Sequence, residues 1–179
     1  MAYHDEVEML ISEEEIDAKV RELADSISRD SRDVDDLVLV GVLKGSFIFL
    51  ADLARRLEVP NSVEFMALST YGDATTTDGA VRMIMDLRRS ISGRHVLVVE
   101  DIVDTGYTLS YLLRNLAARR PASLRTCALV RKPDGHKVDA PVDYLGFEIP
   151  DLWVVGYGLD WAERFRHLPF IGFVTPDAE

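Results

Sequence analysis

The sequence lacks the features that define several large classes of protein. Its only cysteine, Cys127, can form neither an intramolecular disulfide nor a cysteine zinc cluster, and its place in an apolar run predicts a core residue. The longest apolar runs, such as residues 37–43, are far shorter than the ~20 residues of a membrane span. The N-terminus has no basic segment followed by an apolar one, as a signal peptide would have. We therefore expect a cytoplasmic protein with no membrane partner.

Basic residues are also scarce, since 20 Lys and Arg stand against 31 Asp and Glu, for a formal net charge of −11. Proteins that bind nucleic acid need a basic face to neutralise phosphates, so we expect no nucleic-acid partner. The Walker phosphate-binding pattern G-x-x-x-x-G-K-[ST] is absent as well. A small phosphorylated ligand stays possible, because it needs only a few N–H groups, a few cations or a metal ion.

Three segments have the apolar spacing of helices. The first, residues 12–27, begins with a capping box of Ser12 and Glu15 and has acids in its first turn. The second covers residues 45–57, and the third follows residue 108 and ends before Pro121. The residues expected on the three buried faces are Ile16, Val20, Leu23 and Ile27; Phe47, Leu50, Ala51, Ala54 and Leu57; and Leu109, Leu112, Leu113, Leu116 and Ala117.

Apolar, β-rich runs alternate with these helices. They cover residues 36–43, 62–69, 81–87, 94–100 and 123–130. Runs that are apolar throughout are typical of parallel strands covered on both faces. The alternation predicts an α/β fold with a mainly parallel, twisted sheet flanked by helices.

After residue 131 the pattern changes to loops and short strands. We expect a single domain over residues 1–179, with a small cap built from about 1–12 and 132–179. In open α/β sheets, ligands bind beyond the carboxyl ends of the strands. The polar turns after Val42, Glu100 and Val130 would meet at that edge.

The turn inside "VLVVEDIVDTGYTLSYLL", residues 96–113, combines opposite signals. Three acids, Glu100, Asp101 and Asp104, precede a Thr-Gly-Tyr-Thr segment at the start of the third helix. A helix start binds anions through its free N–H groups, whereas acids repel them. A ribose 5-phosphate satisfies both, because its hydroxyls and a magnesium ion can face the acids while its phosphate faces the helix. The alternative is a solvated loop in which Asp104 or Thr105 is the N-cap.

This turn resembles the phosphoribosyl-pyrophosphate motif of type I phosphoribosyltransferases. Four further segments, in order, are similar to the hypoxanthine-guanine branch: "VLKGSF", "STYGD", "ALVRKP" and "GFEIPDLWVVGYGLDWAERFRHLPFIG". The resemblance implies the transfer of ribose 5-phosphate from phosphoribosyl pyrophosphate to N9 of hypoxanthine or guanine in purine salvage. The products would be IMP or GMP and pyrophosphate. It also implies Mg²⁺ as cofactor and a homodimer or homotetramer.

The resemblance assigns roles at the donor end of the site. Lys44 and Gly45 match residues that bind pyrophosphate, often after a cis peptide bond without proline, and Arg166 matches a further pyrophosphate contact. Glu100 and Asp101 match the pair that faces the ribose hydroxyls and the metal. The residues that match the 5′-phosphate cradle are Thr105, Gly106, Tyr107 and Thr108, although some relatives have lysine at the position of Tyr107.

Other matches concern the purine. Asp104 corresponds to a general base near N7, and Lys132 to the lysine that donates to O6. Trp153 takes the place of the aromatic residue that stacks on the base, although a core aromatic is the alternative. Val154 would contact the base through its backbone, and Asp160 matches a residue near a second metal and the 2-position of the purine. Thr70 and Tyr71 match a pair in a closing loop over residues 70–80.

Two other functions fit the same motif. One is a sister enzyme that uses another base, against which Lys132 and "DLWVVGYGLD" argue. The other is a non-catalytic sensor of phosphoribosyl pyrophosphate. Such regulators commonly bind nucleic acid, and the net charge of −11 argues against that. An α/β interaction module would require all five segments to be a coincidence.

Overall fold

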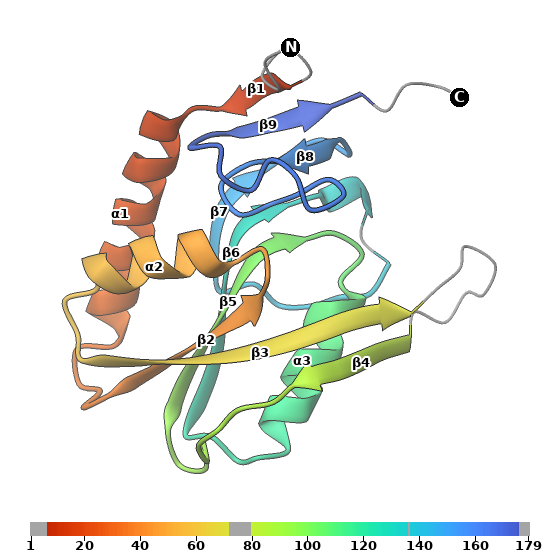
Figure 1. Cartoon of the computed structure of the whole chain (residues 1–179). Coiled ribbons are helices and arrows are strands. Elements are labelled where there is room, and N and C mark those ends of the chain that lie inside the picture. The colour runs from red at the N-terminus through yellow and green to blue at the C-terminus, as the bar shows by residue number, and fades with distance from the viewer. Residues whose placement is uncertain (1–6, 72–79, 136, 176–179) are drawn as a thin grey trace.

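The computed structural model describes residues 7–71, 80–135 and 137–175, which form two sheets and three α-helices (Figure 1). The larger sheet has six strands in the order β4-β3-β2-β5-β6-β7, and the smaller has three in the order β1-β9-β8. The elements are β1 (Glu8–Ile11), α1 (Glu13–Asp30), β2 (Leu37–Leu43), α2 (Phe47–Arg56), β3 (Asn61–Tyr71), β4 (Ala80–Met85), β5 (His95–Val103), α3 (Tyr107–Ala117), β6 (Ser123–Arg131), the 3₁₀ turn η2 (Pro133–Gly135), β7 (Tyr144–Glu148), β8 (Trp153–Val155) and β9 (Ile171–Val174).

The larger sheet confirms the predicted α/β fold. β3, β2, β5, β6 and β7 are mutually parallel, and only β4 is antiparallel, at the edge next to β3. Alternate residues of the central strands point to opposite faces: Leu39 packs with α1 and α2, whereas Val40 packs with α3. Burial on both faces explains why β2 and β5 are apolar almost throughout. Cys127 lies in β6 and is buried, as predicted.

The first helix agrees closely with its prediction. Ser12 accepts a hydrogen bond from the Glu15 N–H, the Glu15 carboxylate accepts one from the Ser12 N–H, and the expected apolar face is buried. In α3, Leu109, Leu112 and Leu116 are buried, but Ala117 is exposed.

The predicted face of α2 was partly wrong. Phe47 is 44% exposed and Ala51 is exposed, whereas Phe49 and Leu53 are fully buried beside Leu50. The segment is apolar at many neighbouring positions, so two helical faces fit its pattern. Packing against β2 and α1 decides between them.

The smaller sheet joins the two ends of the chain, because β9 pairs antiparallel with both β1 and β8. It lies beyond the carboxyl ends of the parallel strands (Figure 1). β7 does not belong to it, since β7 extends the larger sheet beside β6. Residues 144–148 are therefore part of the main sheet rather than of the small one. Within the described ranges, no helix is long and apolar enough to cross a membrane.

Candidate active site

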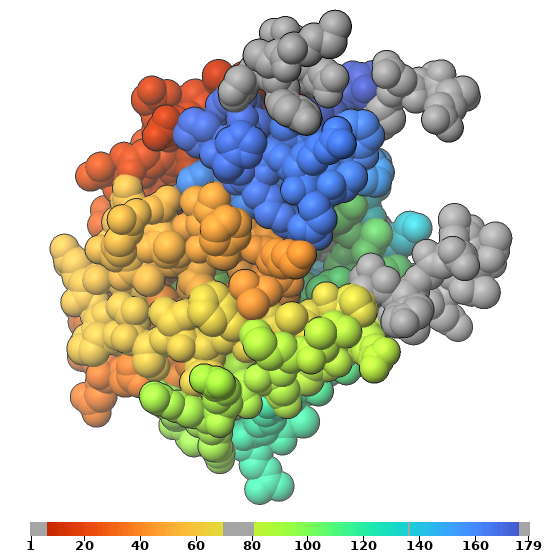
Figure 2. Space-filling model, viewed as in Figure 1, coloured from red at the N-terminus to blue at the C-terminus, as the bar shows by residue number. Residues whose placement is uncertain are grey.

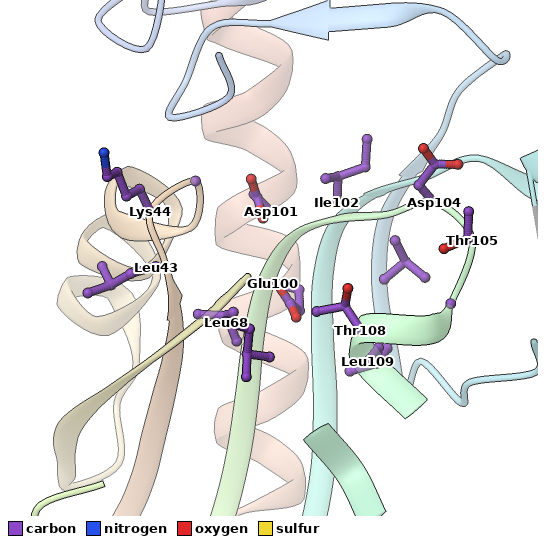
Figure 3. Close-up of a pocket in the computed structure, with 14 residues that line it drawn as sticks. Leu43, Lys44, Leu68, Glu100, Asp101, Ile102, Asp104, Thr105, Thr108 and Leu109 are labelled. Atoms are coloured by element: carbon purple, nitrogen blue, oxygen red, sulfur yellow. The ribbon is translucent and has the colours of Figure 1, made fainter. Parts of the chain in front are cut away.

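A cavity of about 410 Å³ opens at the carboxyl ends of β2 and β5 (Figure 3). β2 and β5 are neighbours in the sheet, so the turns that follow them face each other. In the view of Figure 3, Lys44 and Asp104 lie on opposite sides of the cavity, with Asp101 between them. The lining includes eight of the residues singled out from the sequence: Lys44, Gly45, Glu100, Asp101, Asp104, Thr105, Gly106 and Thr108.

The helix start beside this cavity is not capped by an acid. Gly106 is the N-cap residue of α3, its φ is 85°, and no side chain caps the helix. The alternative in which Asp104 or Thr105 caps the helix is therefore wrong. A φ in the left-handed region favours glycine, which explains why Gly106 stands between the two threonines. Because no side chain occupies them, the first N–H groups of α3 are available to an anion.

The turn before α3 is fixed from its other side. The Thr105 carbonyl accepts hydrogen bonds from the N–H groups of Lys137 and Val138 at 3.0 and 3.1 Å. The Val103 carbonyl accepts one from the Lys132 N–H at 3.0 Å. The polar turns after β5 and β6 are thus held together, as the sequence predicted for turns at the same edge of the sheet.

Glu100 and Asp101 lie at the floor of the cavity, in an unfavourable environment for charge. Glu100 is 5% exposed, and its pKa is well above the usual value, first because of burial and then because of the neighbouring Asp101. Burial also raises the pKa of Asp101 to about 6, although two backbone N–H groups and Arg166 partly offset it. A cation placed beside these acids would favour their ionised forms.

Gly45 brings the turn after β2 against Asp101. The peptide bond between Leu43 and Lys44 is cis, in agreement with the expectation from the resemblance. A Cβ atom on Gly45 would lie 1.6 Å from Asp101 Oδ2, so a larger residue there would displace the Asp101 carboxylate. A Cβ atom on Gly158 would likewise lie 2.0 Å from the Gly45 carbonyl oxygen. The C-terminal segment therefore packs closely on this turn, as Figure 2 shows for the surface of the molecule.

Arg166 is held near this turn, although it does not line the cavity. Its Nη1 donates to the Gly158 carbonyl at 2.8 Å, and its Nη2 lies 2.8 Å from Asp160 Oδ1. Its Nη2 is also 3.4 Å from Glu163 Oε2. Glu163 in turn accepts hydrogen bonds from Lys44 Nζ, which lower the pKa of its carboxyl. Glu163 and Gly158 were not singled out from the sequence.

Lys132 lies next to Asp104, which lines the side of the cavity opposite Lys44, although Lys132 itself is not part of the lining. The Lys132 side chain is 10% exposed, and its Nζ lies 3.6 Å from Asp104 Oδ2. Nζ also donates to Asp151 Oδ1 at 3.1 Å. Gly135 in η2 lies against Asp104, since a Cβ atom there would be 2.4 Å from Oδ1. Asp151 is another residue that sequence reasoning missed, because an isolated acid in a loop has no signature of its own.

The remaining predicted residues lie outside the cavity lining. Trp153 is 56% exposed at the start of β8, which excludes the alternative of a core aromatic. Val154 is buried, and Tyr107 begins α3. Thr70 and Tyr71 end β3, and their side chains, with loop residues 72–79, lie outside the described parts of the chain.

The three proposed metal ligands do not form a ready-made metal site. Within the described ranges, no group of three or more His, Cys, Asp or Glu side chains could hold a metal ion. Asp160 is paired with Arg166, whereas Glu100 and Asp101 are consecutive residues of β5. The protein alone thus offers two adjacent carboxylates.

Comparison with known proteins identifies the class to which this fold and site belong. Residues 7–161 match the family model of the phosphoribosyl transferase domain. The chain therefore belongs to the phosphoribosyltransferase family and is an enzyme of the pentosyltransferase class.

Within the family, the chain is similar to hypoxanthine-guanine phosphoribosyltransferases. It is 50% identical over 168 residues to the enzyme of that name from Dictyostelium discoideum, covering 92% of this chain and 93% of the other. It is 46% identical over 176 residues to the Bacillus subtilis enzyme, covering 98% and 97%. The crystal structure of a hypoxanthine phosphoribosyltransferase from Staphylococcus aureus superposes with a TM-score of 0.92, at 40% identity and with 98% and 96% of the chains covered.

Proposed function

We propose that the chain transfers a 5-phosphoribosyl group from phosphoribosyl pyrophosphate to N9 of hypoxanthine or guanine in purine salvage. The observation that carries the proposal is the pair of Lys132 and Asp104, 3.6 Å apart, beside an uncapped helix start. Lys132 is a donor for O6 of a 6-oxopurine and Asp104 is an acceptor for the N7 proton, so the pair complements the edge of the base that carries both atoms. The helix start, one turn away, supplies N–H groups for a phosphate. Relatives that share up to 50% of the sequence have names that specify the same reaction.

The donor would lie across the cavity from Lys44 to α3. Its 5′-phosphate would bind the N–H and hydroxyl groups of residues 105–108, and its pyrophosphate would bind Lys44, the Gly45 N–H and Arg166. The ribose hydroxyls would donate to Glu100 and Asp101. Arg166 supports this arrangement because two acceptors, Gly158 and Asp160, already hold its guanidinium near Gly45.

The purine would occupy the side of the cavity next to the smaller sheet. Lys132 would donate to O6, Trp153 would stack on the ring with its exposed face, and Val154 would contribute backbone groups. Asp160 would lie toward the 2-position. We propose the smaller sheet as the base-binding cap of a single domain. Thr70 and Tyr71 stay predictions for a loop that closes over the donor.

Mg²⁺ fits the acids of this site. The carboxyl pKa values of Glu100 and Asp101 are raised by burial, so both acids gain from a nearby cation. Mg²⁺ typically takes one or two carboxylates together with substrate phosphates, which suits two adjacent acids without a third. Glu100 and Asp101 are the residues that would hold it, and Asp160, which is paired with Arg166, would lie near a second ion. When bound, the ion would supply positive charge that stabilises the leaving pyrophosphate.

In the proposed reaction, the bond between C1 of the ribose and the pyrophosphate oxygen breaks, and a bond between C1 and N9 forms. Lys44 and Arg166 stabilise the negative charge that develops on pyrophosphate, and the prior placement of Arg166 by Gly158 and Asp160 limits reorganisation during the reaction. Asp104 accepts the proton that the purine loses from N7. Lys132 binds O6 and so fixes the position of the base, and its Nζ lies 3.6 Å from Asp104 Oδ2.

One assay separates this function from its alternatives. The purified chain is incubated with Mg²⁺, phosphoribosyl pyrophosphate and one of hypoxanthine, guanine, xanthine or adenine, and nucleotide and pyrophosphate are measured. We expect turnover with hypoxanthine, guanine or both. Turnover with xanthine alone would favour the sister enzyme. Donor binding without turnover of any base would favour the sensor and refute the proposal.

A further inference from the structure

Lys44, the proposed pyrophosphate-binding lysine, already has an anionic partner. Its Nζ donates to Glu163 Oε1 at 3.0 Å and to Oε2 at 3.1 Å. The two residues lie 119 positions apart in the sequence, one after β2 and the other in the loop between β8 and β9. Both side chains are about two-thirds exposed, so burial does not enforce the contact.

Glu163 also approaches the second proposed pyrophosphate contact. Its Oε2 lies 3.4 Å from Arg166 Nη2. A single carboxylate thus lies between the two cations that are proposed to bind the leaving group. Two cations converging on the oxygens of one anion is also the arrangement that a pyrophosphate requires.

The loop backbone directs Glu163 toward this position. Ala162 and Glu163 have φ values of 51° and 63°, and the Glu163 N–H donates to Asp160 Oδ2 at 2.8 Å. Arg166 does not depend on Glu163 for its place, because Gly158 and Asp160 hold its guanidinium at 2.8 Å each. Lys44, by contrast, makes side-chain hydrogen bonds only to Glu163 among the residues that the structure describes. Loss of the carboxylate would therefore mainly release Lys44.

We propose that the Glu163 carboxylate competes with pyrophosphate for Lys44. It binds Lys44 when the site is empty, and pyrophosphate must displace it. The inference rests on the proposed function, because it assigns the same cations to pyrophosphate. Glu163 is then a positioning residue that weakens pyrophosphate binding. It returns to Lys44 as pyrophosphate leaves and so favours release of this product.

The expected size of the effect follows from the exposure of the pair. Exposed ion pairs typically change an equilibrium constant by only about 1.4- to 5-fold. Loss of the Glu163 charge also removes its repulsion of the pyrophosphate anion, which increases the affinity for pyrophosphate further. We expect Glu163→Gln to bind pyrophosphate about two- to fivefold more tightly. Glutamine has the same length and can keep the backbone N–H contact to Asp160.

Isothermal titration of sodium pyrophosphate into the full chain with Mg²⁺ measures this directly, without turnover. The matched control is Glu22→Gln, because Glu22 is 66% exposed and pairs with Lys19 at 2.6 Å on α1, outside the cavity lining. Both variants lose one negative charge, so they differ only in the position of that charge and in its contact with Lys44. The gain for Glu163→Gln should exceed that for Glu22→Gln and should shrink in 0.5 M salt.

A double-mutant cycle with Lys44→Met tests the mechanism. If Glu163 competes with pyrophosphate for Lys44, Glu163→Gln should increase the affinity for pyrophosphate much less in the Lys44→Met background than in the wild type. Unchanged or weaker pyrophosphate binding by Glu163→Gln, an equal gain in both backgrounds, or no measurable binding by any variant overturns the inference. Failure of the function appears separately, as absent nucleotide formation with all four bases while the binding differences persist.

Discussion

Substitution of Asp101 by Asn should stabilise the free protein, and the gain should depend on pH. The native fold raises the pKa of this carboxyl from 3.8 to about 6, chiefly through burial. Between these pH values the native state binds more protons than the unfolded state, so stability falls as the pH rises through this window. Asparagine has no proton to lose and avoids that loss.

The magnitude follows from the two pKa values. The difference between 3.8 and about 6, at ~1.4 kcal/mol per pH unit, corresponds to about 3 kcal/mol. Asp101 is only partly buried, and solvent screening lowers the figure to about 1–3 kcal/mol. For a chain of this size, that is a rise of about 2–12 °C in Tm at pH 8. Near pH 4.5 the difference should fall to about a third of this.

Thermal unfolding from pH 4.5 to 8, without magnesium, measures the effect. Asp25→Asn is the control, because it removes the same charge from an exposed position on α1. Adding Mg²⁺ and pyrophosphate should raise the Tm of the wild type more than that of Asp101→Asn, since the variant has lost a proposed ligand. A variant that is no more stable at pH 8, or whose gain persists unchanged at pH 4.5, would refute the reasoning.

Three further substitutions test individual contacts. Asp104→Asn should lower kcat by about 10²–10⁴-fold and leave the affinity for phosphoribosyl pyrophosphate nearly unchanged, so a near-normal kcat in a folded protein contradicts its role as base. Lys132→Ala should raise KM for hypoxanthine and guanine by about 10- to 150-fold, the loss of one charge-assisted hydrogen bond, and unchanged KM values would exclude that contact. Gly45→Ala should weaken pyrophosphate binding, measured by titration, because the new methyl carbon would lie 1.6 Å from the Asp101 carboxylate; binding equal to wild type would show that the turn can yield.

Much of the fold was predictable because its signals are local. The capping box of Ser12 and Glu15 needs only residues three positions apart, and the apolar runs of β2 and β5 identify strands covered on both faces. The face of α2 was not predictable, since Phe47 and Phe49 fit the pattern equally well until β2 and α1 select one.

The candidate site was predictable where one turn holds several residues and not where distant segments meet. The acids and hydroxyls after β5 are adjacent in the sequence, so their joint position needs no tertiary information. The pairing of Lys44 with Glu163 depends on how the loop before β9 folds over the turn after β2. The sequence shows only that Lys44 and Glu163 have opposite charges, and several other acids in the same segments could equally have paired with Lys44.

The position of β5 between β2 and β6 also determines when the site can form during folding. His95 of β5 pairs with Leu37 of β2 on one side and with Ser123 of β6 on the other. These three strands, which are distant in the sequence, must therefore pair before the polar turns that follow them come together. Such long-range pairing is slow, because chain entropy is lost before the contacts compensate for it. A chain with only its helices formed would contain no part of the cavity. Recovery of pyrophosphate binding during refolding would therefore report completion of the central sheet rather than helix formation.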